Sequence, residues 1–184
     1  MKKYLLLLVI IPLLATNLHS QTELVIESFD NWVDGIPEGY EWAGLPDTLY
    51  TAISEITGQS GSALKIIDLN GPIHGHGALR RNIFFSRTTI PDSIAHYYKG
   101  PTPYISEGMI RIYFIDSGVT VQSFIIFLFS RTNWQRISDA LQYAGLPFNE
   151  IRIRIDVCQD PLYNNEWGGC DEIALIWNST IQLI

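Results

Sequence analysis

Strict alternation of apolar and polar side chains is the feature that most constrains the fold of this chain. The clearest run is Ile151-Arg152-Ile153-Arg154-Ile155-Asp156-Val157, in which every second residue is aliphatic. Successive side chains of a β-strand point to opposite faces of a sheet, so the aliphatic residues face one side and Arg152, Arg154 and Asp156 face the other. The run therefore predicts a strand that is half buried against a core.

Period-two patterning continues through much of the chain after Gln21. Residues 108–115 and 119–129 form two such runs, and the Asp116-Ser117-Gly118 segment between them tolerates the positive φ of a tight hairpin turn. Further strands are expected at residues 23–29, 48–56, 62–68, 78–85 and 172–177. About eight strands predict an all-β, two-sheet antiparallel sandwich or jelly roll. The absence of strand–helix–strand alternation argues against a nucleotide-binding α/β sheet.

Two segments are expected to lie outside the strands. Residues 137–144 are the one stretch that can form a helix, and this helix is short, so the fold holds one short helix at most. Residues 91–103 contain prolines and tyrosines and are expected to form a long loop, because proline cannot donate a ladder hydrogen bond in a central strand.

The N-terminus has the pattern of a secretory signal. Lys2 and Lys3 precede an apolar run over residues 4–14, which is too short for the about 20 residues that span a bilayer. Cleavage after Ser20 is expected, with cleavage after Ala15 as the alternative, and no cysteine follows the run to carry a lipid anchor. The organisation predicted is a signal peptide at 1–20 and one domain at 21–184. The domain is expected to be secreted, whether extracellular, on the cell surface or periplasmic, without membrane insertion.

The charge balance excludes some partners. The chain has 12 Lys and Arg against 19 Asp and Glu, for a formal charge of −7. A protein that binds nucleic acid or an anionic membrane surface must present a cationic face. Neither is therefore an expected partner of this acidic chain. The adjacent Arg80 and Arg81 are either a small anion-contacting spot or a solvated strand edge. At 47% hydrophobic and 17% charged residues, the chain can build a packed core without a metal or a dense set of disulfides.

Cys158 and Cys170 are the only two cysteines, and export would place them where a disulfide persists. Each ends an expected strand. Cys158 shares the outward parity of Arg152 and Arg154, and Cys170 has the parity of Glu172. If Val157 and Ile173 face one core, both sulfur atoms lie on the opposite face, so a disulfide is predicted. Two buried thiols are the alternative.

Four short blocks resemble the jelly-roll domains of secreted bacterial proteins, which include carbohydrate-binding modules and the carbohydrate-metabolism domains of gut-type Bacteroidetes. The blocks are Phe29-Asp30-Asn31-Trp32, Ile36-Pro37-Glu38-Gly39-Tyr40, Gly58-Gln59-Ser60-Gly61-Ser62-Ala63-Leu64-Lys65-Ile66 and Gly169-Cys170-Asp171-Glu172-Ile173-Ala174-Leu175. Their order spans nearly the whole chain after residue 20. Asp30 departs from the usual Glu, Tyr40 from the usual Trp, and Cys170-Asp171-Glu172 replaces a paired aspartate. The resemblance implies a galactose-binding-like jelly roll and a glycan ligand.

A structural calcium ion is also expected. Asp171 shares the parity of Ile173, Leu175 and Trp177, so its carboxylate heads the face that enters the core and needs a partner. Calcium, which takes 6–8 oxygen ligands at about 2.3–2.6 Å, would satisfy it. The resemblance implies further ligands from Asp30, the Ser28 carbonyl and the carbonyls of residues 58–62. Capping of Asp171 by backbone N–H groups is the alternative.

Aromatic residues in loops or at strand ends are the candidate glycan contacts, because their faces bind sugar rings and their tips are polar. They are Trp32, Tyr40, Trp42, Tyr163 and Trp167, with Asn164 and Asn165 beside the last pair. Trp32 and Tyr40 have a second interpretation as plugs for the end of the sandwich.

No catalytic residue is predicted, because no nucleophile elbow, zinc-protease helix or phosphate loop is present. His74 and His76 are half of a zinc site without a recognisable third ligand. The leading hypothesis is a non-catalytic, glycan-binding module. A surface module that contacts another protein is the second hypothesis. A small glycoside hydrolase, which requires two carboxylates on either side of the scissile bond, is the third.

Overall fold

The computed structural model describes residues 18–43, 52–67, 69–70, 75–100, 109–127, 131–141, 146–159 and 167–181. These residues form strands and their connections, and no helix among them is long and apolar enough to cross a membrane. The strands are β1 (Leu18–Glu27), β2 (Trp32–Val33), β3 (Ile36–Pro37), β4 (Glu41–Trp42), β5 (Ile53–Thr57), β6 (Ser62–Ile67), β7 (Gly75–Arg87), β8 (Ser93–Gly100), β9 (Met109–Asp116), β10 (Val119–Phe127), β11 (Arg131–Ala140), β12 (Phe148–Gln159) and β13 (Trp167–Ile181).

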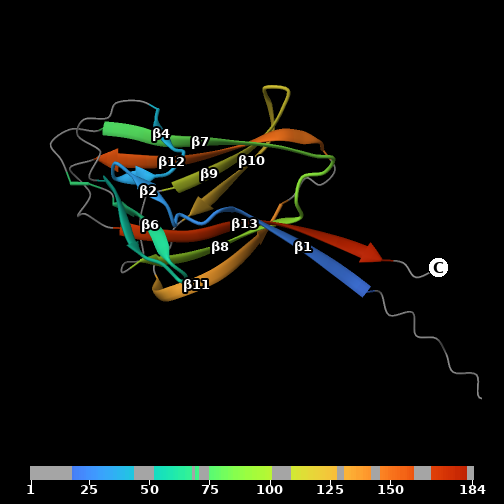
Figure 1. The fold of residues 1–184 in the computed structure, drawn as a ribbon, viewed down its shortest axis with the longest axis horizontal. Helices are drawn as coiled ribbons and strands as arrows, with labels where there is room; N and C mark the ends of the chain where they lie inside the picture. Colours follow the sequence, from blue (N-terminus) through green and yellow to red (C-terminus); the bar gives the residue numbers. More distant parts are fainter. Residues whose placement is uncertain are drawn as a thin grey trace, which may run out of the picture.

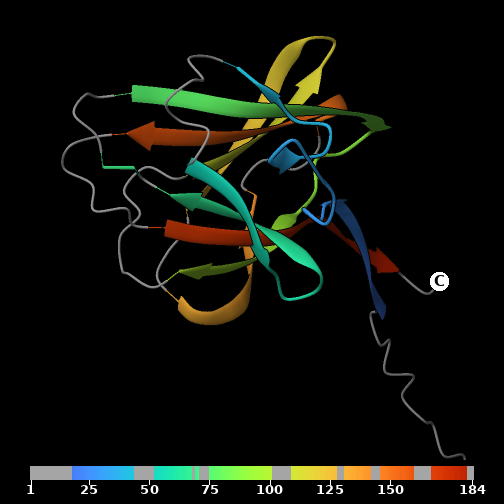
Figure 2. The same cartoon turned by 60° about the vertical axis from the view of Figure 1, so that its left-hand side comes forward.

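The strands stack as two antiparallel sheets, which confirms the predicted sandwich (Figure 1). One sheet has the order β11-β8-β13-β6-β5, with β1 paired to β13, and the other has the order β10-β9-β12-β7-β4. We call the latter the five-stranded sheet. Strands β2 and β3 form a separate small ribbon. The two layers remain distinct when the molecule is turned (Figure 2).

The core lies between the sheets and is built from the alternating residues that the sequence identifies. Ile151, Ile153, Ile155 and Val157 of β12 are buried, and the polar residues between them are only partly buried. Strands β9, β6, β8 and β13 supply further aliphatic core residues, including Ile110, Ile112, Leu64, Ile66, Ile94, Ile173 and Leu175. Burial of each such side chain contributes about 1.5–3 kcal/mol, so this interior dominates the stability of the sandwich.

The predicted hairpin is present between β9 and β10. Ser117 has φ 50° and Gly118 has φ 81°, and Val119 pairs with Asp116 across the turn. The strands predicted around residues 23–29, 62–68, 78–85 and 172–177 are confirmed as β1, β6, β7 and β13. Residues 48–51 of the predicted strand at 48–56 lie outside the described residues, and β5 occupies 53–57.

The long loop predicted for residues 91–103 is wrong, because Ser93–Gly100 forms strand β8 inside the larger sheet. It pairs with β11 on one side and with β13 on the other. The prolines of the segment do not interfere with the ladder, because none occurs between Ser93 and Gly100. Ile94, Ala95 and Tyr98 are buried, so this strand is part of the core layer.

A helix at residues 137–144 is wrong for the part of that segment that the structure describes. Residues 137–140 belong to β11, and Leu141 follows it without helical structure. Ile137 pairs with His96, and Asp139 pairs with Ile94. A helix this short has no stable nucleus, so pairing with β8 overrides the local pattern.

A bulge in β13 changes the face on which its first residues lie. Glu172 has φ 45°, and between Asp171 and Ala174 β13 advances three residues while β8 advances two, from Tyr97 to Ala95. An extra residue of this kind breaks the period-two alternation. Cys170 therefore packs into the core together with Ile173, although strict alternation would put them on opposite faces.

The predicted disulfide is wrong, since Cys158 and Cys170 are both buried thiols that are not joined. Cys158 lies on the five-stranded sheet, on the outward side with Arg154 and Asp156, as its parity predicts. Cys170 lies on the other sheet and points into the core because of the β13 bulge. The strand alternation holds, but its phase shifts at Glu172.

The predicted signal peptide lies mostly outside the described residues, which begin at Leu18. Residues 18–20 form the start of β1 and pair with the end of β13, where Leu18 is opposite Ile181. In Figures 1 and 2 these paired ends extend away from the body of the sandwich. Export and the cleavage position stay predictions.

Candidate functional site

The outward face of the five-stranded sheet carries a row of charged side chains on four adjacent strands, β4, β7, β12 and β9. Residues that pair across neighbouring strands point to the same side, so the register gives the row directly. Arg154 of β12 is opposite Arg80 of β7 and Arg111 of β9. Glu41 of β4 continues the row at one end, and Ile125 of β10 continues it at the other. We call Arg80, Arg154 and Arg111 the arginine row.

One carboxylate holds two members of the arginine row. Asp156 accepts a hydrogen bond from Arg154 Nε at 2.6 Å through Oδ1, and its Oδ2 lies 2.9 Å from Arg111 Nε. Arg80 lies 4.0 Å from the exposed Glu41 carboxylate. All three arginine side chains remain about two-fifths exposed, so each is partly accessible to solvent and to ligands.

Aromatic and amide groups lie next to the arginine row on the same face. Arg152 is opposite Asn82 and Tyr113, and its Nε donates to Asn82 Oδ1 at 3.0 Å. Nη2 of the same Arg152 guanidinium group lies 3.2 Å from Glu150 Oε1 and forms an ion pair with it. Phe84 lies opposite Glu150 and is 75% exposed, which is unusual for a large apolar ring. The face thus combines stacking surfaces with planar hydrogen-bonding groups.

A cavity of about 250 Å³ opens at the end of this face. Its lining includes Arg111, Arg154 and Asp156 from the row, together with His76 and Cys158. His76 was predicted as half of a zinc site. It is exposed at this cavity, and its predicted companion His74 lies outside the described residues.

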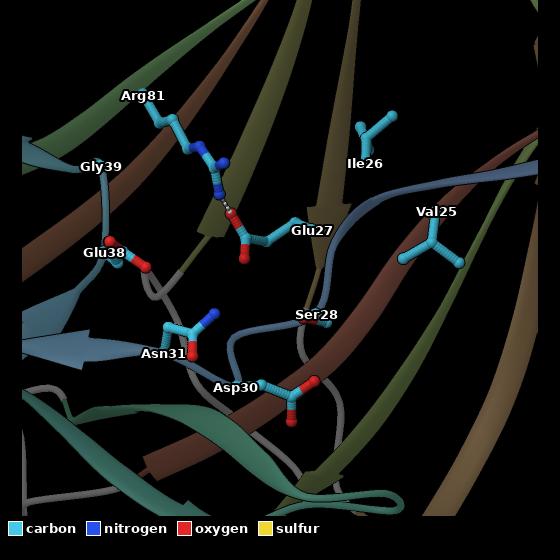
Figure 3. Close-up of a pocket in the computed structure, with 9 residues that line it drawn as sticks. All are labelled: Val25, Ile26, Glu27, Ser28, Asp30, Asn31, Glu38, Gly39 and Arg81. Carbon is cyan, nitrogen blue, oxygen red and sulfur yellow. Dashed lines mark hydrogen bonds and ion pairs between the residues drawn. The ribbon is translucent and has the colours of Figure 1, made fainter.

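A second cavity, of about 540 Å³, lies beside the end of β1 and is lined largely by polar groups (Figure 3). Glu27 is buried there and forms an ion pair of 2.6 Å with Arg81, which reaches across from β7. Asp30, Asn31 and Glu38 line the same space. The sequence left open whether Arg81 contacts an anion, and the structure places this arginine against a carboxylate of the chain itself.

Tyr40 closes the inner side of this region and is 6% exposed. Burial raises the pKa of its hydroxyl well above the usual value, and the Glu27 carboxylate raises it further. Its ring stacks near Phe29, with centroids 6.3 Å apart. This arrangement matches the interpretation of Tyr40 as a plug at the end of the sandwich, since almost none of its face is available for a sugar.

The other predicted glycan contacts lie in several places. Trp32 and Trp42 are partly buried and pack against the core, and Trp32 Nε1 donates to the Phe29 carbonyl at 2.8 Å. Trp167 begins β13 and is partly buried beneath Lys65, whose Nζ lies 4.9 Å from the ring centroid. Tyr163, Asn164 and Asn165 lie outside the described residues. The described part of the predicted set does not form one exposed surface.

Two of the residues predicted to bind calcium, Asp30 and Asp171, both contact the turn between β5 and β6. Asp171 is 2% exposed, and its Oδ2 accepts hydrogen bonds from the N–H groups of Gln59 at 2.8 Å and Ser60 at 3.3 Å. Asp30 Oδ1 accepts from the Ser62 N–H at 3.1 Å. Backbone capping of Asp171, the alternative to a metal, is thus directly present. Figure 3 shows Ser28 and Asp30 just after β1, at the edge of the cavity described above.

Glycine is required in this turn because both carboxylates approach it closely. A Cβ at Gly61 would lie 2.1 Å from Asp30 Oδ1, and a Cβ at Gly58 would lie 2.5 Å from Asp171 Oδ2 and 2.9 Å from the Ser62 carbonyl oxygen. Burial raises the pKa of Asp171, its two backbone hydrogen bonds lower it, and the nearby Asp30 charge raises it. No cluster of three or more His, Cys, Asp or Glu side chains suited to a metal occurs among the described residues.

Alternation along β12 predicts that Arg152, Arg154 and Asp156 face outward, but it does not indicate that they belong to a site. Phe84 and Tyr113 were missed because they lie in strands, where an aromatic residue normally indicates core. The signal that finds them is parity: Phe84 alternates with the inward-facing Ile83 and Phe85, and Tyr113 alternates with Ile112 and Phe114. The structure shows which strands bring these positions together.

No family model matches the chain, and no curated protein matches it significantly. Among solved structures, it is similar to a family 61 carbohydrate-binding module in complex with β-1,4-galactotriose, with 12% identity and a TM-score of 0.45 over 77% of this chain and 90% of that chain. A mutant family 29 carbohydrate-binding module has 18% identity and a TM-score of 0.45, over 90% of this chain and 100% of that chain. The family 11 module of a Clostridium thermocellum cellulosomal cellulase has 12% identity and a TM-score of 0.44, over 84% and 94%.

Proposed function

We propose that this chain is an exported, non-catalytic glycan-binding module that holds an oligosaccharide on the outward face of its five-stranded sheet. The observation that carries the proposal is the exposed ring of Phe84 beside Tyr113, Arg152 and Asn82 on three adjacent strands. Sugar rings combine apolar C–H faces with a rim of hydroxyl groups, so they bind where flat rings lie next to planar hydrogen-bonding groups.

The scaffold supports this assignment because the contact residues lie on strands rather than on loops. Strand β12 pairs along most of its length with β7 and β9, so Arg152, Asn82 and Tyr113 share one cross-strand row. The Arg152 guanidinium is held by both Asn82 and Glu150. A face positioned in this way is preorganised, which reduces the entropy lost when a ligand binds.

Affinity electrophoresis through a panel of soluble neutral and acidic polysaccharides tests the proposal. We expect at least one polysaccharide to retard the native protein and Phe84→Ala to weaken that retardation by about tenfold, which is the effect of losing about 1.4 kcal/mol of stacking and burial. Val33→Ala, which truncates an exposed residue of the β2–β3 ribbon, is the matched control and should not change it.

Two results would contradict this assignment. Absence of retardation by every polysaccharide favours the second hypothesis, a surface module that contacts another protein. Retardation that is lost in Tyr163→Ala and Trp167→Ala but kept in Phe84→Ala would place the binding surface at the segment before β13.

We also propose that a structural calcium ion binds at the β5–β6 turn. Support comes from the two carboxylates of Asp30 and Asp171 and the Ser62 carbonyl, which converge on a turn where only glycine fits. Oxygen donors of this kind suit calcium, and a cation would relieve the repulsion between the two carboxylates. Asp30, Asp171 and the Ser28 carbonyl are the ligands proposed.

Calcium binding to the folded state must raise its stability, by about 2.7 kcal/mol at a free concentration one hundred times the Kd. We expect added calcium to raise the Tm of the chelated native protein and to have no such effect on Asp171→Asn. Asp34→Asn, which changes an exposed aspartate away from this turn, should respond like the native protein. An unchanged Tm would leave backbone capping as the complete explanation of Asp171.

A further inference from the structure

The arginine row concentrates positive charge in a chain that is acidic as a whole. Four of the eight arginines, at positions 80, 111, 152 and 154, lie on the outward face of the five-stranded sheet, although the formal charge of the chain is −7. Arg80, Arg154 and Arg111 are directly opposite one another in register. Directly opposed residues in a sheet have Cβ atoms about 4.5–5.5 Å apart, and like charges at that spacing destabilise the fold.

The carboxylates on this face only partly offset that repulsion. Among the described residues of this face there are four arginines and three carboxylates, Glu41, Glu150 and Asp156, and Asp156 contacts both Arg154 and Arg111. Glu41 is 77% exposed and 4.0 Å from Arg80, which makes it a weak partner. Arg80 Nε is buried and makes no hydrogen bond. An anion that bridged these guanidinium groups would therefore satisfy charge and hydrogen bonding together.

The arginine row also borders a cavity that can hold an anionic group. The cavity of about 250 Å³ is lined by Arg111 and Arg154, whose guanidinium groups remain partly exposed. Guanidinium groups bind planar or tetrahedral oxyanions through paired hydrogen bonds, with a directionality that lysine lacks. All the cations in this row are arginine, and none of the chain's four lysines takes a position in it.

We infer that the glycan bound on this face is acidic, and that the arginine row holds its carboxylate or sulfate groups. This inference rests on the proposed function and specifies its ligand class. Phe84 and Tyr113 contact the rings of the polysaccharide, while Arg80, Arg154 and Arg111 recognise the charge. A neutral polymer of the same backbone lacks the group that compensates the row, so it binds more weakly.

The test compares polymers that differ only in charge. Isothermal titration calorimetry is run with polygalacturonate and with its methyl ester for carboxylate, and with dextran sulfate and dextran for sulfate. We expect one charged polymer to bind at least about tenfold more tightly than its neutral counterpart, with an affinity that falls as salt concentration rises. The pair that shows the difference identifies the anionic group.

Variants separate recognition by the row from general attraction to positive charge. Arg154→Gln should reduce affinity for the charged polymer by about tenfold or more, the effect of losing one charge-assisted contact. Arg136→Gln removes the same charge from β11 of the other sheet, where Arg136 pairs with Glu23, and should change affinity less than about twofold. Thermal unfolding of both variants confirms that they are folded, and Arg80→Gln provides a second test of the row if Arg154→Gln is not.

The failure of this inference differs from the failure of the proposed function. Equal affinity for charged and neutral polymers, with Phe84→Ala still weakening binding, would overturn the acidic ligand and keep the glycan-binding function. Equal losses in Arg154→Gln and Arg136→Gln would overturn the row as the recognition element. Absence of binding to every polymer, in this experiment and in the wider panel, would overturn both.

Discussion

His96 is a buried histidine on β8, next to Tyr98, with its ring centroid 5.9 Å from that ring. It is 2% exposed, and its Nδ1 atom makes no hydrogen bond. Burial disfavours the imidazolium and lowers its pKa from 6.5 to about 4, and the Asp139 carboxylate on β11 raises it only partly back. The folded protein therefore holds this side chain neutral at a pH where the unfolded chain protonates it.

This shift makes the stability depend on pH in a defined window. The unfolded state binds more protons than the folded state between the two pKa values, so stability is full above about pH 6.5 and falls as the pH is lowered toward 4. The loss from His96 is about 3 kcal/mol. We expect urea unfolding of His96→Gln to lose less stability over this range than the native protein does. His76→Gln, at an exposed position, should keep the native dependence, and a native slope in His96→Gln would contradict the assignment.

The hairpin between β9 and β10 shows how a single turn can be improved at the level of the element. Ser117 and Gly118 both have positive φ, which is the geometry of a type I′ turn. Asparagine tolerates the first of these positions better than serine does, because its side chain bonds to the local backbone in the left-handed region.

Ser117→Asn should therefore raise the free energy of unfolding by about 0.5–1 kcal/mol, which corresponds to a Tm increase of about 1–4 °C for a chain of this size. Gly118→Ala is the opposing variant and should lower the Tm, since its φ of 81° is strained for alanine. Differential scanning calorimetry measures both changes. A Tm for Ser117→Asn at or below the native value would show that the turn is not limited by its first residue.

Local patterns predicted individual strands better than they predicted the relations between strands. The run from Ile151 to Val157 specified both faces of β12, and the turn residues specified the β9–β10 hairpin, because each signal lies within a few residues. Strand β8 was missed because the prolines on either side of it in the sequence suggested a loop, and its position depends on pairing with β11 and β13. No window of sequence contains those partners.

At the scale of the whole molecule, the candidate site depends on such long-range pairing even more than the fold does. Arg80, Arg111 and Arg154 lie far apart along the chain, and only the order β9-β12-β7 makes them neighbours. Alternation gave the direction in which Arg154 points, but it could not identify the two arginines beside it. The predicted disulfide was wrong for a related reason. The bulge at Glu172 decides which face of the sheet each residue of β13 occupies, and it turns Cys170 into the core.

The bulge at Glu172 makes the number of residues in β13 more critical than its composition. Everything from Ile173 onward faces its present side because one additional peptide unit at Glu172 resets the alternation. Removing that unit would move each residue after it to the opposite face of the sheet, so Ala174 and Ile176 would take the side that Ile173 and Leu175 now occupy even though no side chain had been replaced. Engineering of this scaffold must therefore keep the number of residues between Asp171 and Ala174 unchanged, whichever side chains are replaced.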